Sequence, residues 1–90
     1  MVDVMHYKVI KRQDIADQNT VVYLLESDGG RYFTTTIAPE DIDLKVGDVL
    51  QHNTGNIWLT KEGKRVRFSV YLECTGMAEA EEKFKSLITG

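Results

Sequence analysis

The most regular pattern in this chain is an alternation of apolar and polar side chains over residues 65–74. Successive side chains of a β-strand point to opposite faces, so this segment predicts one unbroken, half-buried strand. The face toward the core would carry Val66, Phe68, Val70, Leu72 and Cys74. The opposite face would carry Arg65, Arg67, Ser69, Tyr71 and Glu73.

Five further strands are predicted, over roughly residues 4–11, 20–27, 31–37, 49–52 and 57–61, because short runs of β-branched and aromatic residues lie between turn signals. The polar stretch Arg12–Thr20 is expected to be a loop. Ala38–Ile42 is expected to form one helical turn, since proline suits the first turn of a helix. Ile42, Leu44 and Val46 would then pack against the sheet.

A C-terminal helix is predicted over about residues 77–88. Its apolar side chains recur at spacings of three, four and seven, which places them on one helical face. These side chains are Met77, Ala80, Phe84, Leu87 and Ile88. We expect this face to cover an open end or seam of the sheet, and the alternative is that it forms a homodimer surface.

The turn at Asp28–Gly30 allows two registers between the strands that flank it. A two-residue loop would place Leu24 opposite Phe33, whereas a three-residue loop would place Leu25 opposite Phe33. A shift of one residue exchanges core and surface positions. Both registers bring apolar side chains together, so the pattern leaves the choice open.

The turn near Gly63 allows two registers as well. A loop of two or four residues pairs Leu59 with Val66 and leaves Trp58 opposite Arg67 on the outer face. A three-residue loop ending at Gly63 turns Trp58 inward against Val66 instead. We favour the first register, because the apolar positions of three successive strands then share one face.

Composition and length predict one small domain over residues 1–90, since 42% of the side chains are hydrophobic. The segment Lys45–Leu50 resembles the turn-into-strand element of SH3-like barrels, although such a six-residue match occurs in many unrelated proteins. The expected fold is mainly β: a small antiparallel meander of five or six strands, or a partly closed SH3-like barrel, with one C-terminal helix.

The chain has 11 basic and 14 acidic side chains, and its net charge of −3 works against unspecific binding to phosphate backbones or anionic lipid. Acidic residues gather over residues 40–48, while residues 61–67 are basic apart from Glu62. This separation would steer a partner, let two surfaces of the molecule attract each other, or leave two solvated faces. Without a leader pattern or a long apolar run, the sequence predicts a cytoplasmic protein without membrane contact.

Neither the two histidines nor the single cysteine has the spacing of a metal site. Cys74 is expected to be a buried thiol rather than an exposed nucleophile. The seven glycines are dispersed and form no phosphate-binding loop. The sequence therefore predicts no catalytic residue, metal or cofactor.

The remaining candidate is a surface of exposed cations and aromatic rings, which suits contacts with another protein. Its residues are Trp58, Lys61, Lys64, Arg65, Arg67 and Tyr71. We expect a non-catalytic protein-binding module, such as an adaptor, a subunit or a stoichiometric inhibitor. The ordinary alternative is that these long side chains only shield the sheet from water.

Two other functions remain open. The same rings and cations could stack and neutralise a single-stranded nucleic acid. A small-molecule site, catalytic or not, could instead open at a barrel end near His52 and Asp48.

Overall fold

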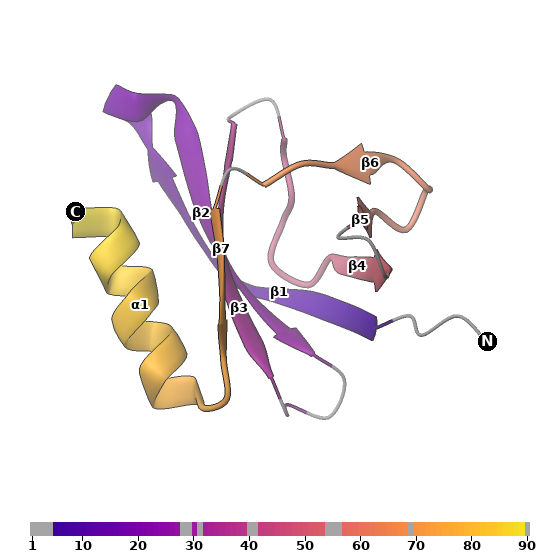
Figure 1. Ribbon diagram of the computed structural model, residues 1–90. Coiled ribbons are helices and arrows are strands. Elements are labelled where there is room, and N and C mark those ends of the chain that lie inside the picture. Colours follow the sequence, from indigo (N-terminus) through magenta and orange to yellow (C-terminus); the bar gives the residue numbers. More distant parts are fainter. Residues whose placement is uncertain are drawn as a thin grey trace.

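The computed structural model describes residues 5–27, 30, 32–39, 42–53, 57–68 and 70–89, and of residues 53, 57, 70 and 71 it describes the backbone alone. These residues form one open, seven-stranded antiparallel sheet and one α-helix (Figure 1). The elements are β1 (Met5–Ile15), the 3-10 turn η1 (Ala16–Gln18), β2 (Thr20–Ser27), β3 (Phe33–Pro39), β4 (Val49–Asn53), β5 (Ile57–Leu59), β6 (Arg65–Val66), β7 (Val70–Cys74) and α1 (Met77–Thr89).

The strand order across the sheet is β6-β5-β4-β1-β2-β3-β7. The expectation of a mainly β fold with an antiparallel sheet and a C-terminal helix is confirmed. The expectation of a partly closed barrel is not, because β6 and β7 lie at opposite edges of the sheet although they follow each other in the chain. Closure would require these two edges to pair, and the described strands leave them apart.

The predicted strand over residues 65–74 is divided into two. β6 pairs with β5, whereas β7 pairs with β3 at the far edge. Val66 and Phe68 pack in one core, and Cys74 packs in another. The alternation therefore reflects burial against two different cores, and it does not require a single straight strand.

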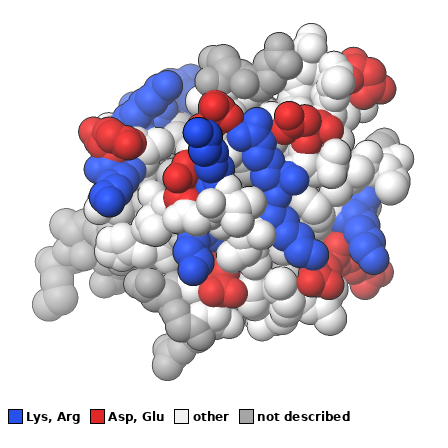
Figure 2. Space-filling view, turned by 180° about the vertical axis from the view of Figure 1, so that it is seen from behind, with Lys and Arg blue, Asp and Glu red and all other residues white. Residues whose placement is uncertain are grey.

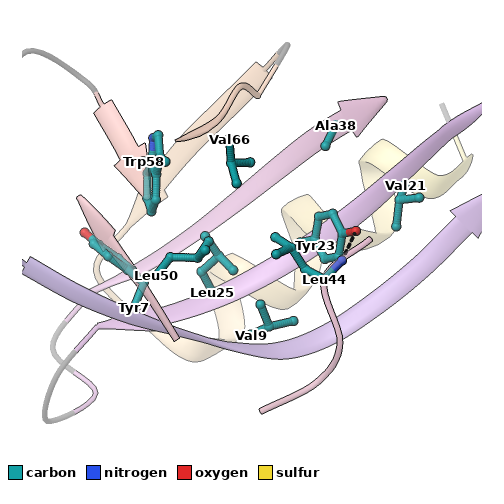
Figure 3. Packing of buried hydrophobic residues seen from close by; sticks show 10 residues of the cluster. All are labelled: Tyr7, Val9, Val21, Tyr23, Leu25, Ala38, Leu44, Leu50, Trp58 and Val66. Atoms are coloured by element: carbon teal, nitrogen blue, oxygen red, sulfur yellow. Dashed lines mark hydrogen bonds between the residues drawn. The ribbon is translucent and has the colours of Figure 1, made fainter. Parts of the chain in front are cut away.

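The two cores lie on opposite faces of the sheet. The first, which we call the inner core, contains the side chains drawn in Figure 3: Tyr7, Val9, Val21, Tyr23, Leu25, Ala38, Leu44, Leu50, Trp58 and Val66. The second, the helix core, contains Val22, Leu24, Phe33, Cys74, Ala80 and Phe84. Figure 1 shows α1 on one side of β2, β3 and β7, and the β4–β6 end of the same sheet on the other side. Alternate side chains of β2 serve both cores, so this strand is buried on both faces.

β1 is longer than predicted, because the stretch expected to be a loop continues the strand to Ile15. Its register on β2 shifts between Val9 and Lys11, where the strand is irregular. Beyond that point Lys11 and Arg12 are partly exposed and Gln13 and Asp14 are exposed, but all four still pair with β2. A strand with one face in water can consist of polar residues. The pattern of apolar residues therefore could not show that β1 continues through this stretch.

Neither expected register of the β2–β3 hairpin is correct, since Glu26 pairs with Phe33. Ser27 closes the described part of the hairpin by donating its N–H to the Tyr32 carbonyl at 2.9 Å. Phe33 and Leu24 both lie in the helix core, so the register with a two-residue loop assigns these side chains to the correct face of the sheet. It is nevertheless shifted by two residues from the observed pairing. Of the turn itself, residues 28 and 29 are outside the described residues.

The helical turn expected at Ala38–Ile42 is not formed as predicted, because Ala38 and Pro39 belong to β3. Residues 40 and 41 of the expected turn lie outside the described residues, and Ile42 donates its N–H to the Pro39 carbonyl at 3.0 Å. Leu44 is buried in the inner core and Ile42 packs against it, as predicted. Val46 is 64% exposed, so its predicted burial is wrong.

Helix α1 confirms the prediction in place and in length. Ala80 and Phe84 are buried, and Leu87 and Ile88 are partly buried against the same core. The helix covers one face of the sheet around β2, β3 and β7 rather than a barrel end. Among the described residues, no helix has the length and apolar character needed to cross a lipid bilayer.

Candidate functional site

Trp58 does not lie on an outer face, which corrects the predicted surface. Its side chain is only 2% exposed. The indole stacks on His52 with ring centroids 4.0 Å apart and planes 11° apart. It also contacts Tyr7 and Phe68, each with centroids 5.2 Å apart. Trp58 is therefore a central side chain of the inner core.

The β5–β6 turn explains this orientation. Thr60 donates its N–H to the Lys64 carbonyl at 2.8 Å, and Gly63 donates its N–H to the Thr60 carbonyl at 2.9 Å. Gly63 has a φ of 86°, which glycine adopts readily and other residues do not. This is the three-residue loop, and it pairs Trp58 with Val66. The register that we did not favour is thus the correct one.

The four cations of the predicted surface remain together on one segment. Lys61, Lys64, Arg65 and Arg67 are all exposed on the β5–β6 hairpin and the residue after it. Tyr71 is separated from them, because its backbone pairs with Thr36 at the opposite edge of the sheet. Its side chain lies outside the described part of the chain. The structure brings the cations together but not the two aromatic rings.

A pocket of about 350 Å³ opens between residues 42–50 and residues 60–66. Its apolar floor is formed by Leu44, Leu50 and Val66, which are also buried in the inner core. We call this cavity the hairpin pocket. The sequence analysis missed it, because its two walls are distant in the chain and only the tertiary structure brings them together.

Charged side chains of opposite sign line the two walls of the hairpin pocket. Asp43 and Asp48 come from the first wall, and Lys61 and Lys64, with the acidic Glu62 between them in sequence, come from the second. The separation of acidic and basic segments along the sequence therefore has a spatial counterpart. The acidic and basic segments were visible in the sequence, but the sequence could not show that they line the same pocket.

The acidic wall is fixed by hydrogen bonds within the chain. Arg12 donates to the Asp43 carboxylate, and this hydrogen bond lowers the pKa of Asp43. Asp48 accepts the N–H of Lys45 at 2.9 Å through Oδ2. In the described part of the chain, by contrast, no ion pair involves Lys61 or Lys64. The basic wall is therefore the one able to receive an external anion.

Tyr23 anchors the acidic wall to the sheet. Its hydroxyl donates to the Ile42 carbonyl at 2.8 Å and accepts the Leu44 N–H at 3.1 Å. Arg12 adds a hydrogen bond to the Leu44 carbonyl at 2.8 Å, and its guanidinium lies 5.9 Å from the centre of the Tyr23 ring. Burial raises the pKa of Tyr23, so its hydroxyl stays protonated as a donor. These contacts hold the wall in place without help from a ligand.

Two other groups with potential chemistry, Cys74 and His52, do not line the pocket. Cys74 is buried as predicted, and this burial raises the pKa of its thiol, which disfavours the reactive thiolate. His52 packs on Trp58, whereas Asp48 lines the hairpin pocket. Among the described residues, no three His, Cys, Asp or Glu side chains are grouped so that they could hold a metal ion.

The face of the molecule turned away from the viewer in Figure 1 carries charges of both signs. Figure 2 shows Lys and Arg side chains interspersed with Asp and Glu, so neither sign covers this face. A basic stripe that could follow a phosphate backbone is not seen there.

Comparison with known proteins adds no relative: no protein-family model, no curated protein and no solved structure matches this chain.

Proposed function

We propose that this protein is a non-catalytic protein-binding module that contacts its partner through the hairpin pocket and the basic hairpin at residues 61–67. This retains the function expected from the sequence but moves its site away from Trp58. An adaptor, a subunit and a stoichiometric inhibitor would each use a surface of this kind.

The observation that carries the proposal is an apolar-floored pocket with an exposed basic rim. Its volume of about 350 Å³ is at the lower end of the range of about 300–1,000 Å³ typical of ligand pockets. It suits one large side chain of a partner better than an extended ligand. Buried anchor side chains of this type dominate the binding energy of many protein interfaces.

The basic rim indicates the chemistry of the partner. Lys61 and Lys64 have no ion pair in the described part of the chain, and Arg65 and Arg67 are exposed beside them. A segment with an apolar anchor and neighbouring carboxylates would fill the floor and pair with these cations. Such charge complementarity raises association rates and selects between partners.

The test is affinity isolation from the native cell with two variants that change the net charge equally. In Lys61→Glu/Lys64→Glu the basic rim is reversed, whereas in Lys8→Glu/Lys85→Glu two exposed lysines outside the pocket are reversed. We expect the rim variant to retain at least tenfold less of a partner protein than the wild type does. The control variant should retain as much of it as the wild type. Equal retention by both variants would contradict the proposed site.

A small-molecule ligand is the second candidate, because Asp48 and the two lysines offer opposite charges around the same apolar floor. A zwitterionic metabolite would satisfy both walls at once. A panel of metabolites should then contain a compound that raises the melting temperature of the wild type but not of Lys61→Glu/Lys64→Glu. A panel without any shift would count against this candidate.

Binding of single-stranded nucleic acid was expected to use stacking against Trp58 and Tyr71, and the backbone of Tyr71 lies at the opposite sheet edge from the cations. Because the Trp58 ring is 2% exposed, it offers no platform to a base. Lys61 and Lys64 face acidic residues across the pocket, which weakens their attraction for phosphates. We therefore do not propose this function.

A further inference from the structure

The two edges of the sheet are built differently. β6 has only two residues, of which Arg65 is exposed, and the exposed Lys64 and Arg67 flank it. Short length and positive charge are common ways in which proteins protect a sheet edge from pairing. β7 has five residues, Val-Tyr-Leu-Glu-Cys, with one charge and no proline. The β7 edge lacks the protection that the β6 edge has.

The helix core extends to the β7 edge. Leu72 lies two residues before Cys74 and so on the same face of the sheet, yet its side chain is 36% exposed. Met77, at the start of α1, is 38% exposed. An apolar strip thus continues from the buried helix core to the open edge.

We propose that the β7 strands of two copies of this chain pair antiparallel around a two-fold axis at Leu72, which joins their sheets into one. The pairing follows from the symmetry: Leu72 lies opposite Leu72, Tyr71 opposite Glu73, and Val70 opposite Cys74. A two-fold interface must be complementary to itself. This register meets that condition, since it places no like charges opposite each other along β7.

Charges on the helix favour the same arrangement. Glu79 and Lys83 lie on the flank of α1 next to β7, since both influence the pKa of Cys74. The axis would bring the corresponding flanks of two antiparallel helices face to face. Glu79 of each copy could then approach Lys83 of the other, and this pair attracts across the axis, although Glu82 lies beside them on the helix.

The helices leave room for this pairing. α1 packs against β2, β3 and β7, so it is centred over β3. In a joined sheet the two β3 strands would lie about 14 Å apart, since neighbouring strands are separated by about 4.8 Å. A helix with side chains is about 10–12 Å wide. The helices therefore do not clash, and Leu72 and Met77 of both copies would line the groove between them.

Analytical ultracentrifugation over a range of concentrations tests the association. We expect the wild type to sediment with twice the monomer mass at high concentration. In Leu72→Lys two like charges would meet at the axis, and we expect dimerisation to weaken at least tenfold. A monomeric wild type at all concentrations, or a dimer that Leu72→Lys leaves unchanged, would overturn the proposal.

A disulfide test does not depend on how well Leu72→Lys folds. Paired residues of antiparallel strands have Cα atoms about 4.5–5.5 Å apart, within the range that a disulfide bridges. In a Cys74→Ala background, Leu72→Cys should form a covalent dimer under mild oxidation, whereas the exposed Gln13→Cys should not. Equal crosslinking of the two variants would overturn the two-fold register at Leu72.

Discussion

Trp58 shows how a single side chain determines a register. Trp58 and Leu59 are neighbours in a strand, so only one of them can face the inner core. A buried aromatic side chain of this size removes about 150–250 Å² from water. At about 25 cal/mol per Å² its burial stabilises the fold more than burial of leucine does. The structure accordingly buries Trp58 and leaves Leu59 only partly covered.

Replacement of this side chain should therefore be costly. We expect Trp58→Ala to lower the free energy of unfolding by about 3–5 kcal/mol, as for other large-to-small changes in a core. Val46→Ala, at a position that is 64% exposed, is the control and should change it by less than about 0.5 kcal/mol. Urea unfolding followed by circular dichroism measures both. Similar values for the two variants would show that the indole is not a core residue.

The contact between Arg12 and Asp43 makes stability depend on pH. The hydrogen bond from Arg12 lowers the pKa of Asp43 in the folded state below that of the unfolded chain. Its contribution is present above the unfolded pKa and is lost as the pH falls through the folded pKa. Acid should therefore weaken the contact between Arg12 and Asp43 in the wall of the hairpin pocket, while the Tyr23 hydrogen bonds to the same wall remain.

We expect Asp43→Asn to be less stable than the wild type at pH 7 and to approach it as the pH falls below about 4. Chemical denaturation at several pH values measures the difference. Asp17→Asn, at an exposed position in η1, is the matched control. If the two proteins differed in free energy of unfolding by the same amount at pH 7 and at acidic pH, the assigned role of the Asp43 carboxylate would be refuted.

Among the elements, the β5–β6 hairpin carries most of the candidate site. Its turn is fixed by the backbone hydrogen bonds between Thr60, Gly63 and Lys64. Lys64 also donates its N–H to the Thr60 hydroxyl at 3.0 Å. A glycine after Glu62 was visible in the sequence and indicated the three-residue loop. Agreement of apolar positions across strands was the weaker guide, because Trp58 and Leu59 are both apolar and the pattern did not show which of them faces the inner core.

The positive φ of Gly63 leads to a prediction about this turn. A Cβ atom at φ 86° is strained, so Gly63→Ala should lower the free energy of unfolding by about 1–2 kcal/mol. Gly76→Ala is the control, because a Cβ there meets open space and φ is not positive. Thermal unfolding compares them. If Gly63→Ala were as stable as Gly76→Ala, the left-handed turn would be wrong.

The whole molecule is organised around β2, which separates the two cores and belongs to both. Val21, Tyr23 and Leu25 enter the inner core, while Val22 and Leu24 enter the helix core. Loss of packing on either face would expose the same strand. We therefore expect the two cores to unfold together as one cooperative unit.

Two existing probes can test this coupling. Trp58, the single tryptophan, reports on the inner core by fluorescence, and α1 reports on the helix core by circular dichroism. Phe84→Ala removes a helix-core side chain and should destabilise by about 3–5 kcal/mol. We expect it to lower the midpoint of the fluorescence transition as much as that of the helix signal. Separate midpoints would show that the cores unfold independently.

The candidate site was predictable only in part. The basic segment at residues 61–67 and the acidic segment before it are local features, and the structure confirms that their described lysines and arginines are exposed. The hairpin pocket was not predictable, because the floor residues Leu44, Leu50 and Val66 are far apart in the chain. Trp58 was grouped with the cations because of the register that we favoured at the Gly63 turn, and Tyr71 because of the assumed continuous strand over residues 65–74.

By itself, the sequence determined the features that depend on neighbouring residues: most strands, helix α1, the burial of Cys74 and the position of the charges. Local periodicity and propensity act over a few residues, so they leave a clear pattern. The tertiary structure alone decided the division of residues 65–74 between two sheet edges, the orientation of Trp58 and the two-sided burial of β2. These depend on which core a face meets, and apolar side chains do not encode that choice because hydrophobic burial has no direction.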